Sequence, residues 1–594
     1  MAEGFATLSQ TFQHQARKYG DRAFLKQKRD GAWRDFSWIE IEREASLLRA
    51  GLIRDGIKAG DRVGILADNS PEWVIADHAI LGLGGVVVPL YTTSSVDETR
   101  HIINDSGARA LFVNGEDMAR KVLGMGSSIP GVERIVAMHP GAAARDKGFG
   151  TAPVVPVKAA MGETVAPIYE GKRDDLATLI YTSGTTGASK GVMLTHGNLL
   201  SNCEDSLESL GLTDTDMTLS ILPVAHSFER TAGHYAVMMG GGTIAYAEGL
   251  AQVASNLQDV KPTILLVVPR LLEAIYARVT RTVQTGSPMR RRLFNMAMAT
   301  GRRAAEYRNR GERVPAALAA RMAIFRKLVF HRITEIFGGR IRSVISGGAP
   351  LPTEIDWFFL SAEVPLVEGY GLTEAAPVVS VNPRRFNKVG TVGYHLRHVE
   401  AKTAPDGELM LKGPNIMKGY WGREQDTREA LDSDGWLHTG DIAQIDSDGY
   451  IKITDRKKEI IVLSGGKNVS PANLENRMAS DPYIAQACVI GDRRKHLSAL
   501  LVPNIENLQA FLKEKGLQGK PVAELINSPD LRAFYHARLR DFNKTLSDVE
   551  AIVAFTLVAS PFTQDNGELT PTLKLRRKMV QEHYRDQINA MYRD

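Results

Sequence analysis

The chain has 594 residues, 43% of them apolar, and a formal net charge of +5 at pH 7. This length exceeds what one hydrophobic core supports, so we expect a soluble protein of several domains or subdomains. The sequence has no uncharged apolar run of about 18 residues and no basic and apolar leader, which argues against a spanning helix or a secretory signal. Cys203 and Cys488 lack the spacing of a disulfide framework or a zinc site, and a reducing cytoplasm is the expected location.

The first 170 residues or so alternate helical patterns with short apolar runs. Two such runs are 62–66 and 85–90. This rhythm is typical of an α/β domain with parallel strands. The small and polar stretch 141–148 is interpreted as a surface loop.

A stretch rich in glycine and hydroxyl groups follows the apolar run 176–180. From Tyr181 to Gly191 it contains three glycines, five serines or threonines, and Lys190. Backbone N–H groups, hydroxyls and one cation suit a polyanion, so the stretch is interpreted as a phosphate loop. A Walker loop is excluded because it requires Gly-Lys-Ser/Thr in direct succession, and a flexible surface loop is the alternative. The candidate phosphate contacts here are Thr182, Ser183, Gly184, Thr185, Thr186, Gly187 and Lys190.

The next segment, 222–230, contains His226, Glu229 and Arg230. A single histidine is more often structural than functional, so both roles stay open for His226 on this evidence. We expect Arg230 to neutralise its neighbour Glu229, which would leave a buried substrate ammonium without a partner.

Basic residues are concentrated between 290 and 332, where they mix with apolar residues at helical spacing. This pattern predicts amphipathic helices with a basic face that could touch anionic lipid. The alternative is a solvated helical face, because Glu306 and Glu312 dilute the basic pattern.

Two glycine-containing segments follow buried strand patterns in the second half of the chain. The run 342–345 precedes Ser346-Gly347-Gly348-Ala349, where paired glycines allow the backbone to approach a flat ring closely, or simply form a turn. The heptapeptide 368–374 supplies an aromatic ring, a hydroxyl and a carboxylate in Tyr370, Thr373 and Glu374. A carboxylate beside phosphates suits magnesium, a hard cation.

The block 434–475 contains a hairpin signal at 446–450 with Asp441 before it and Arg456 after it. Asp441 could accept hydrogen bonds from two ribose hydroxyls, and Arg456 could fix ribose or phosphate. Beyond them lie Lys458, a glycine loop with Gly465, Gly466 and Lys467, and the segment Thr570-Pro571-Thr572-Leu573-Lys574. Lysines near a terminus are mostly solvated, and Arg576, Arg577 and Lys578 allow a simply cationic terminus.

These motifs, in this order, resemble the adenylate-forming superfamily of acyl-CoA synthetases, peptide-synthetase adenylation domains and firefly-type luciferases. The similarity runs from about residue 10 to 590 and is strongest to bacterial long-chain fatty-acid–CoA ligases. It implies an α/β fold with a large N-terminal domain of parallel and mixed sheets flanked by helices (1–454) and a smaller, mobile α+β C-terminal domain (455–594). One departure is Val367, where many relatives carry tyrosine.

The resemblance also implies roles for individual residues. Gly348, Ala349, Tyr370 and Gly371 would hold adenine, Thr373 the α-phosphate, Glu374 magnesium, and Asp441 with Arg456 the ribose side of ATP. Lys574 would be the catalytic lysine, with Thr373 and a gating His226 as further catalytic candidates. Lys458 would be the hinge, and Gly465, Gly466 and Lys467 would line the CoA side of the site.

The implied reaction converts a long-chain fatty acid and ATP to an acyl adenylate and pyrophosphate, and then transfers the acyl group to CoA with release of AMP. Amino-acid-activating relatives have an aspartate near segment 222–230, so its composition here favours a plain carboxylic acid. The alternatives are a ligase that loads a carrier protein, a medium-chain or aromatic acid ligase, and a fatty-acid uptake protein without turnover. The expected cofactors are ATP, Mg²⁺ and CoA. Peripheral contact with the inner face of the cell membrane and a homodimer are further expectations, and a nucleic-acid partner is not expected.

Overall fold

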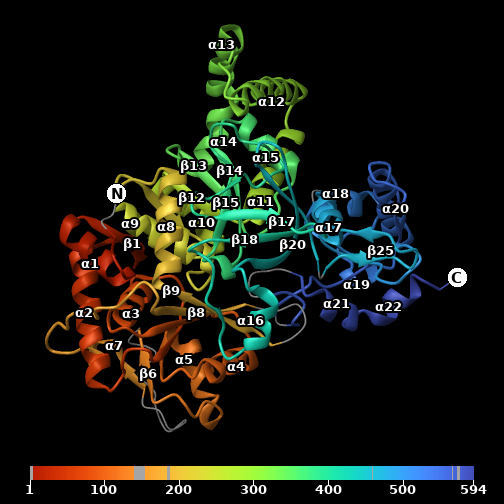
Figure 1. Cartoon of the computed structure of the whole chain (residues 1–594). Helices are drawn as coiled ribbons and strands as arrows, with labels where there is room; N and C mark the ends of the chain where they lie inside the picture. The colour runs from red at the N-terminus through yellow and green to blue at the C-terminus, as the bar shows by residue number, and fades with distance from the viewer. Residues whose placement is uncertain are drawn as a thin grey trace. The chain divides into compact units, whose positions relative to one another are not determined.

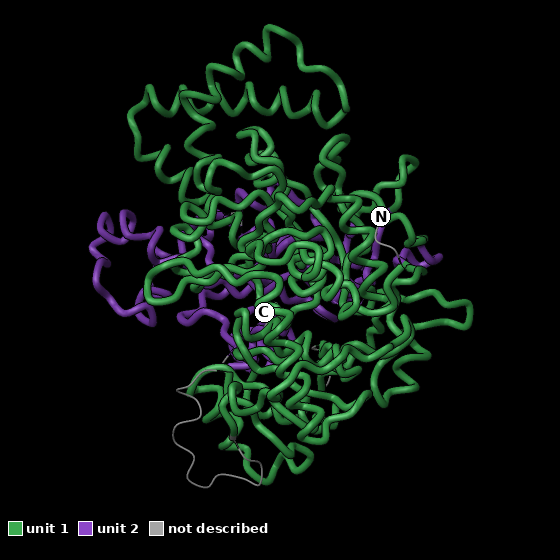
Figure 2. The backbone as a smooth tube through the Cα atoms, turned by 90° about the vertical axis from the view of Figure 1, so that its left-hand side faces the viewer, with its two compact units in different colours: residues 1–402, 410–439, 445–452 green, residues 403–409, 440–444, 453–594 purple. Residues whose placement is uncertain are grey.

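The computed structural model describes residues 4–138, 154–182, 188–457, 459–479, 481–564, 566–570 and 575–593. The chain divides into two compact units, drawn in different colours in Figure 2. The first contains residues 1–402, 410–439 and 445–452, and the second contains 403–409, 440–444 and 453–594. The expected loop at 141–148 lies outside the described residues.

The first unit contains a nine-stranded mixed sheet with the order β16-β15-β14-β13-β12-β10-β11-β1-β2 (Figure 1). Its central strands, from β14 to β1, pair in parallel, and antiparallel strands complete both edges. The bounds are β1 Ala23–Arg29, β2 Ala32–Ser37, β10 Met217–Ser220, β11 Thr243–Tyr246, β12 Ile264–Val267, β13 Ser343–Ser346, β14 Leu366–Gly371, β15 Val378–Val381 and β16 Tyr394–His395.

An eight-stranded sheet, β19-β9-β8-β4-β3-β5-β6-β7, forms the other large layer of this unit. The strands from β8 to β7 pair in parallel, while β8 with β9 and β9 with β19 are antiparallel. The two apolar runs noted in the first 170 residues are β3 and β4. The bounds are β3 Arg62–Leu66, β4 Val86–Leu90, β5 Ala110–Val113, β6 Arg134–Ala137, β7 Val154–Pro156, β8 Leu176–Thr182, β9 Lys190–Thr195 and β19 Gly419–Tyr420.

Helices connect the strands of both sheets, so the predicted α/β class is confirmed. The amphipathic pattern at 290–332 forms helices as predicted. The main helices are α1 Leu8–Tyr19, α2 Trp38–Arg54, α3 Pro71–Gly82, α4 Val96–Ser106, α5 Gly115–Leu123, α8 His196–Leu210, α9 Ala236–Gly240, α10 Val253–Val260, α11 Pro269–Gln284, α12 Pro288–Asn309, α13 Ala316–Phe325, α14 His331–Thr334, α15 Thr353–Ser361 and α16 Glu424–Ala430. Two segments are π-helical, η2 Glu229–Tyr235 and η4 Arg326–Phe330.

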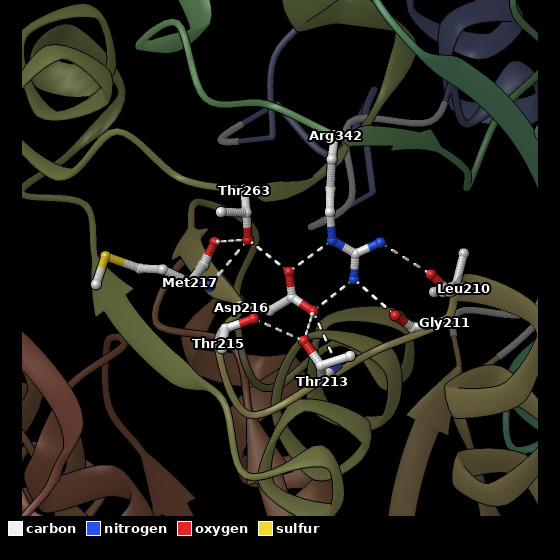
Figure 3. Close-up of polar contacts among 8 residues, drawn as sticks. All are labelled: Leu210, Gly211, Thr213, Thr215, Asp216, Met217, Thr263 and Arg342. Carbon is white, nitrogen blue, oxygen red and sulfur yellow. Dashed lines mark hydrogen bonds and ion pairs between the residues drawn. The ribbon is translucent and has the colours of Figure 1, made fainter.

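A polar cluster ties together the ends of three neighbouring strands in the nine-stranded sheet (Figure 3). Arg342, just before β13, donates from Nε and Nη2 to the Asp216 carboxylate at 2.6 and 2.5 Å. The hydroxyl of Thr263, just before β12, donates to Asp216 Oδ1 at 2.8 Å. Arg342 also donates to the carbonyl oxygens of Leu210 and Gly211 at the end of α8, where free helix carbonyls attract a cation.

The second unit is built around a three-stranded sheet, β24-β25-β26. Alternate residues of β24 and β25 enter two apolar clusters, one containing Val489 and Leu501 and the other Cys488 and Leu500, so both sheet faces are covered. The bounds are β24 Ile484–Ile490, β25 Leu497–Pro503, β26 Ile552–Leu557, α17 Pro471–Ala479, α18 Ile505–Glu514, α19 Val522–Leu525, α20 Pro529–Asn543, α21 Arg577–His583 and α22 Arg585–Ala590.

Two smaller sheets complete the strands. One has the order β17-β18-β20-β21, and residues of these strands are assigned to both units. The other is the hairpin β22-β23 of the second unit. The bounds are β17 Glu400–Thr403, β18 Glu408–Lys412, β20 Leu437–Ile445, β21 Ile451–Arg456, β22 Ile461–Val462 and β23 Asn468–Val469.

Candidate active site

The stretch interpreted as a phosphate loop joins two antiparallel strands, β8 and β9. Thr182 and Lys190 are paired residues at the ends of these strands. Lys190 forms an ion pair with Asp426 of α16, and its ammonium lies 5.4 Å from the ring centroid of Tyr420. The predicted contacts Ser183, Gly184, Thr185, Thr186 and Gly187 lie outside the described residues. The hairpin therefore fixes both ends of the loop and places one cation beside it.

Thr373 and Glu374 follow β14 in a short 3₁₀ turn, η6 (Thr373–Ala375). The Thr373 hydroxyl lies 3.1 Å from the Ser227 hydroxyl, which brings segment 222–230 to this turn. The Glu374 carboxylate accepts a hydrogen bond of 2.9 Å from the Tyr420 hydroxyl. Burial and this carboxylate both raise the pKa of Tyr420, so the phenol stays a donor. Tyr420 thus contacts both Glu374 and Lys190.

At two glycines near this turn, another part of the chain packs so closely that a side chain would not fit without a shift. A Cβ atom added to Gly347 would lie 3.1 Å from the ring of Phe228, and one added to Gly371 would lie 2.2 Å from the carbonyl oxygen of Pro377. Gly348 has a φ of +82°, which favours glycine. The Leu351 N–H donates to the buried Glu368 carboxylate at 3.3 Å, which fastens the turn at 347–349 to β14.

His226 lies in a turn that leads into the π-helix η2. Its Nδ1 accepts a hydrogen bond of 3.1 Å from the Phe228 N–H, and the His226 backbone N–H donates to the Pro223 carbonyl oxygen. These contacts position the ring within its own turn. A π-helical segment often occurs at a functional site, and η2 is buried along its length.

The expected pairing of Arg230 with Glu229 is wrong. Arg230 forms an ion pair with Asp77 of α3, and both side chains are at most 2% exposed. Successive residues of a helix point in different directions, so neighbours in sequence do not face each other. Glu229 is instead buried near His234, and burial raises the pKa of the Glu229 carboxyl to about 8. Glu229 is therefore held neutral by its surroundings rather than by an adjacent cation.

Arg230 is the centre of a buried network in the first unit. It donates to the Thr178 hydroxyl at 2.7 Å and lies over the ring of Trp73. The Tyr235 hydroxyl donates to the other oxygen of Asp77 at 2.7 Å. A small cavity beside this network is lined by Phe24, Trp73, Val74, Asp77, His78, Arg230, His234, Tyr235 and Met238. The network fixes the start of η2 and, through it, the turn that carries His226.

In the second unit, the predicted pair Asp441 and Arg456 is in contact. Arg456 Nε donates to Asp441 Oδ1 at 2.9 Å, and the Asp441 side chain is 6% exposed. The neighbouring backbone is also fixed, because the Gly440 N–H donates to Glu408 and the Lys457 ammonium pairs with the same carboxylate. An ion pair thus joins Asp441, in the middle of β20, to Arg456, the last residue of β21.

The glycine loop of the second unit connects β22 and β23. Gly465, Gly466 and Lys467 are exposed, and Gly466 has a φ of +74° that favours glycine. Lys458 and Lys574 lie outside the described residues, although the flanking Leu569 and Leu575 pair as an antiparallel bridge. Arg577 is not part of a solvated cationic terminus, because its guanidinium forms an ion pair with Glu475 and donates to the Val489 carbonyl.

The first unit thus brings four predicted segments together: the hairpin at Lys190, segment 222–230, the turn at 347–349 and the heptapeptide 368–374. Sequence reasoning missed Tyr420 and Asp426, which contact Glu374 and Lys190. Only the aromatic pair Tyr420-Trp421 after a glycine could have drawn attention to them, and that signal has no fixed spacing to the other motifs.

Two family models match the chain. That of the AMP-binding enzymes matches residues 12–421, and that of the AMP-binding enzyme C-terminal domain matches residues 458–594. The chain is 35% identical to the long-chain-fatty-acid–CoA ligase FadD15 of Mycobacterium bovis, over 98% of this chain and 96% of that protein. It is 32% identical to the peroxisomal long chain acyl-CoA synthetase 7 of Arabidopsis thaliana, over 99% and 86%. Among solved structures, the adenylation domain of a carboxylate reductase from Mycobacterium chelonae aligns with a TM-score of 0.79 at 25% identity, covering 100% of this chain and 92% of that one.

Proposed function

Because the chain belongs to the AMP-binding enzymes, and is related over nearly its full length to long-chain fatty-acid–CoA ligases, we propose that its site activates a long-chain fatty acid with ATP and passes the acyl group to CoA. The carboxylate oxygen attacks the α-phosphorus of ATP, and the bond to pyrophosphate breaks. The sulfur of CoA then attacks the acyl carbon, and AMP leaves. The enzyme is thus an AMP-forming ligase.

The observation that carries the assignment of residues is the contact chain in the first unit. Lys190 and Glu374 both contact Tyr420, and Thr373 next to Glu374 contacts Ser227. A cation, a carboxylate and two hydroxyls therefore lie close to the two glycine-containing segments 346–349 and 368–374. This combination suits the phosphates and the adenine of ATP.

The chemistry explains why charged groups and not a general base fill the site. Two anions meet at the α-phosphorus, so neutralisation and positioning supply most of the catalysis. In our proposal Lys190 and the loop 182–187 hold the leaving pyrophosphate, and Thr373 donates to the α-phosphate. Tyr370 stacks on adenine between Gly371 and the turn at Gly348 and Ala349, and His226 borders the acyl group.

Glu374 is the proposed magnesium ligand. No lysine or arginine of the described ranges pairs with it, and its Oε1 accepts from Tyr420, which leaves Oε2 for a cation. The described residues include no cluster of three or more His, Cys, Asp or Glu side chains that could hold a metal by itself. A single carboxylate fits magnesium, which commonly takes its other ligands from substrate phosphates and water. Bound there, magnesium would shield phosphate charge.

The second unit supplies the remaining proposed roles. Asp441 would accept hydrogen bonds from the ribose hydroxyls, with Arg456 holding it in position. Lys574 would contact the substrate carboxylate and the α-phosphate during adenylation. Rotation of this unit about Lys458 would then withdraw Lys574 and bring Gly465, Gly466 and Lys467 to the CoA thiol.

The overall reaction is tested by incubating the purified protein with ATP, magnesium, CoA and a panel of acids from acetate to oleate. The expected products are AMP, pyrophosphate and acyl-CoA, with the highest rate for a long-chain acid. Product formation without CoA but with an acyl carrier protein would favour carrier loading, and ADP as the product would overturn the proposal. Binding of fatty acid without any nucleotide product would indicate an uptake protein.

Separate assays of adenylate formation and thioester formation test the proposed roles of Lys574 and Lys458. Lys574→Ala should abolish adenylate formation but largely spare thioester formation from supplied acyl adenylate, whereas the exposed Lys578→Ala should leave both unchanged. Lys458→Pro should leave pyrophosphate exchange and slow thioester release, with Lys458→Ala as the control that keeps the backbone free. Equal loss of both half-reactions in the Lys574 variant would refute its assigned role.

Two further proposals concern a membrane and a second copy of the chain as partners. Within the described ranges, no helix has the length and apolar character needed to cross a bilayer. Peripheral contact with an anionic membrane surface through the basic region 290–332 is proposed here, and binding of the full-length protein to vesicles with and without phosphatidylserine tests it. A homodimer is also proposed, and the molar mass in solution tests it.

A further inference from the structure

Tyr420 lies between the two charged groups of the proposed nucleotide site. Its hydroxyl donates to Glu374 Oε1 at 2.9 Å, and its ring centroid lies 5.4 Å from the Lys190 ammonium. The carboxylate belongs to the turn after β14, and the lysine belongs to the first residue of β9. One half-buried side chain therefore contacts both the proposed magnesium ligand and the proposed phosphate contact.

The backbone around Tyr420 is fixed to the strand that carries Lys190. The short strand β19 pairs with β9 in antiparallel fashion, with Tyr420 opposite Val192. The Trp421 N–H donates to the carbonyl oxygen of Gly191 at 2.8 Å, and Gly191 directly follows Lys190. Strand pairing thus sets the position of the aromatic ring relative to the lysine.

The residues just before Tyr420 are fixed to the turn that carries Glu374. The Met417 N–H donates to the backbone carbonyl oxygen of Glu374 at 2.8 Å. The Asn415 side-chain amide donates to the carbonyl oxygen of Ala375, also at 2.8 Å. Asn415 is 2% exposed and Met417 is 3% exposed, so these contacts are buried. The same short segment is therefore bonded to both halves of the proposed site.

Helix α16 holds the Lys190 ammonium beside the ring. Asp426 of this helix forms the ion pair with Lys190, and the two side chains are 29% and 34% exposed. The next residue, Thr427, accepts a hydrogen bond of 2.9 Å from the Tyr420 N–H. Gly419 also approaches Thr427 closely, because an added Cβ would lie 2.6 Å from its methyl carbon. The acid that pairs with Lys190 is thus bonded through its neighbour to Tyr420.

The contact with Tyr420 changes what cation binding at Glu374 costs. A glutamate side chain without a partner samples several rotamers, and a ligand that binds it must first order the side chain. The hydrogen bond from Tyr420 orders the Glu374 carboxylate before a cation arrives, and it uses only Oε1. Ordering a site in advance raises affinity, because less conformational entropy is lost on binding.

We propose that Tyr420 is a positioning residue for the magnesium and phosphates of ATP: its hydroxyl orients the Glu374 carboxylate, and its ring supports the Lys190 ammonium. The inference rests on the proposed function, because that function makes Glu374 the magnesium ligand and Lys190 a phosphate contact. Tyr420 touches no reacting atom in this scheme. It acts through the two groups that it holds.

Calorimetric binding of α,β-methylene ATP tests the hydroxyl without turnover, because this analogue cannot release pyrophosphate. The full-length parent protein should bind the analogue more tightly with magnesium than without it. Tyr420→Phe removes only the hydroxyl and should weaken binding with magnesium by roughly tenfold, since a hydrogen bond to a charged group is lost. Binding without magnesium should stay unchanged in this variant.

Tyr420→Leu tests the ring, because it removes the aromatic face as well as the hydroxyl. It should weaken binding of the analogue without magnesium by about threefold, which corresponds to the loss of a partly exposed cation–π contact with Lys190. With magnesium present, the loss should exceed that of Tyr420→Phe. Equal affinities for the leucine and phenylalanine variants without magnesium would refute the role of the ring.

The matched control removes the same kind of hydrogen bond elsewhere in the first unit. The Tyr276 hydroxyl donates to Glu354 at 2.7 Å, and neither residue belongs to the proposed site. Tyr276→Phe should therefore leave both affinities unchanged. Unchanged melting curves would establish that the three variants fold.

Pyrophosphate exchange separates positioning from a merely structural role. Tyr420→Phe should raise the magnesium concentration for half-maximal exchange by about tenfold and approach the parent rate at saturating magnesium. Unchanged binding of the analogue with magnesium, or an equal loss with and without magnesium, would overturn the proposal. Absence of AMP from the parent protein would instead refute the proposed reaction, so the two failures are distinguishable.

Discussion

Arginine side chains occur in two very different settings within the first unit. Arg230 is 1% exposed, and Asp77, Thr178 and the ring of Trp73 surround its guanidinium. In residues 288–334, here called the arginine-rich segment, seven arginines are exposed and have no carboxylate partner among the described residues. They are Arg290, Arg291, Arg292, Arg303, Arg313, Arg321 and Arg332. In the first setting both terminal nitrogens of the guanidinium donate to partners inside the fold, and in the second the guanidinium is left to the solvent.

The difference separates charges that hold the fold from charges that are free for function. Removing one member of a buried ion pair leaves an uncompensated charge and costs several kcal/mol. An exposed charge without a partner contributes almost nothing to stability. The free arginines therefore need an explanation outside the fold, whereas Arg230 does not. The predictions below test this division, from the largest expected effect to the smallest.

Arg230→Met should lower the free energy of unfolding by about 3–5 kcal/mol, because Asp77 would remain buried without its cation. Denaturant unfolding of the two proteins measures the difference. The double variant Arg230→Met, Asp77→Asn is the control, since it removes both charges and should recover most of the loss. A change below about 1 kcal/mol in the single variant would show that water or other groups solvate Asp77.

Glu229 should make the protein less stable as the pH rises through neutrality. Burial raises the pKa of its carboxyl in the folded state from 4.5 to about 8. The folded state then binds a proton that the unfolded state has lost, so stability is full below pH 4.5 and falls until about pH 8. The expected total loss is a few kcal/mol, in order of magnitude.

The measurement compares Glu229→Gln with the parent protein between pH 6.5 and pH 8. His234 titrates in the opposite sense, because burial lowers its pKa from 6.5 to about 4, so its contribution is already complete above pH 6.5. The variant should lose the downward slope in this window, and the exposed Glu170→Gln should keep it. Parallel pH profiles for Glu229→Gln and the parent would contradict the buried, neutral carboxyl.

The sequence predicted these regions unequally, and the reason is physical. Apolar runs such as 62–66 identified strands, because a strand that is buried on both faces has apolar residues at consecutive positions. The helices of the arginine-rich segment were likewise predictable from spacing. The partner of Arg230 was not, because Asp77 is 153 residues away and the adjacent Glu229 was chosen instead.

The candidate site shows the same limit. Lys190, Thr373 and Glu374 were named from their motifs, and their assigned roles stay predictions. Tyr420 and Asp426 were missed because the fold, not sequence spacing, brings them to Glu374 and Lys190. Tertiary contacts between distant segments leave no periodic signal in one sequence.

Arg342 represents an intermediate case between the two settings. Its side chain is 28% exposed, while Asp216 is 5% exposed. Burial alone would raise the pKa of Asp216, but hydrogen bonds from Arg342, Thr263 and the Thr213 N–H hold it below the usual value (Figure 3). Arg342→Gln should cost about 1–3 kcal/mol of unfolding free energy, less than Arg230→Met, because Thr263 and Thr213 still donate to Asp216.

Thermal and denaturant unfolding measure this change. Arg342→Lys is the matched variant, because it keeps the charge but loses the two-pronged contact with Asp216. It should fall between Arg342→Gln and the parent. A loss as large as that of Arg230→Met would mean that partial exposure does not reduce the cost, and exposure would then be a poor guide to the division between the two settings.

The smallest effect is expected for the free arginines. Arg292→Gln, Arg303→Gln and Arg321→Gln should each change the free energy of unfolding by less than about 0.5 kcal/mol, because no buried partner is left behind. Arg326→Gln is the matched control in the same segment, since it removes one of the two arginines that pair with Glu363, whose side chain is 15% exposed. It should cost about 1 kcal/mol. If the three free arginines proved as costly as Arg326, their charges would belong to the fold, and the argument that they are reserved for an external anion would lose its basis.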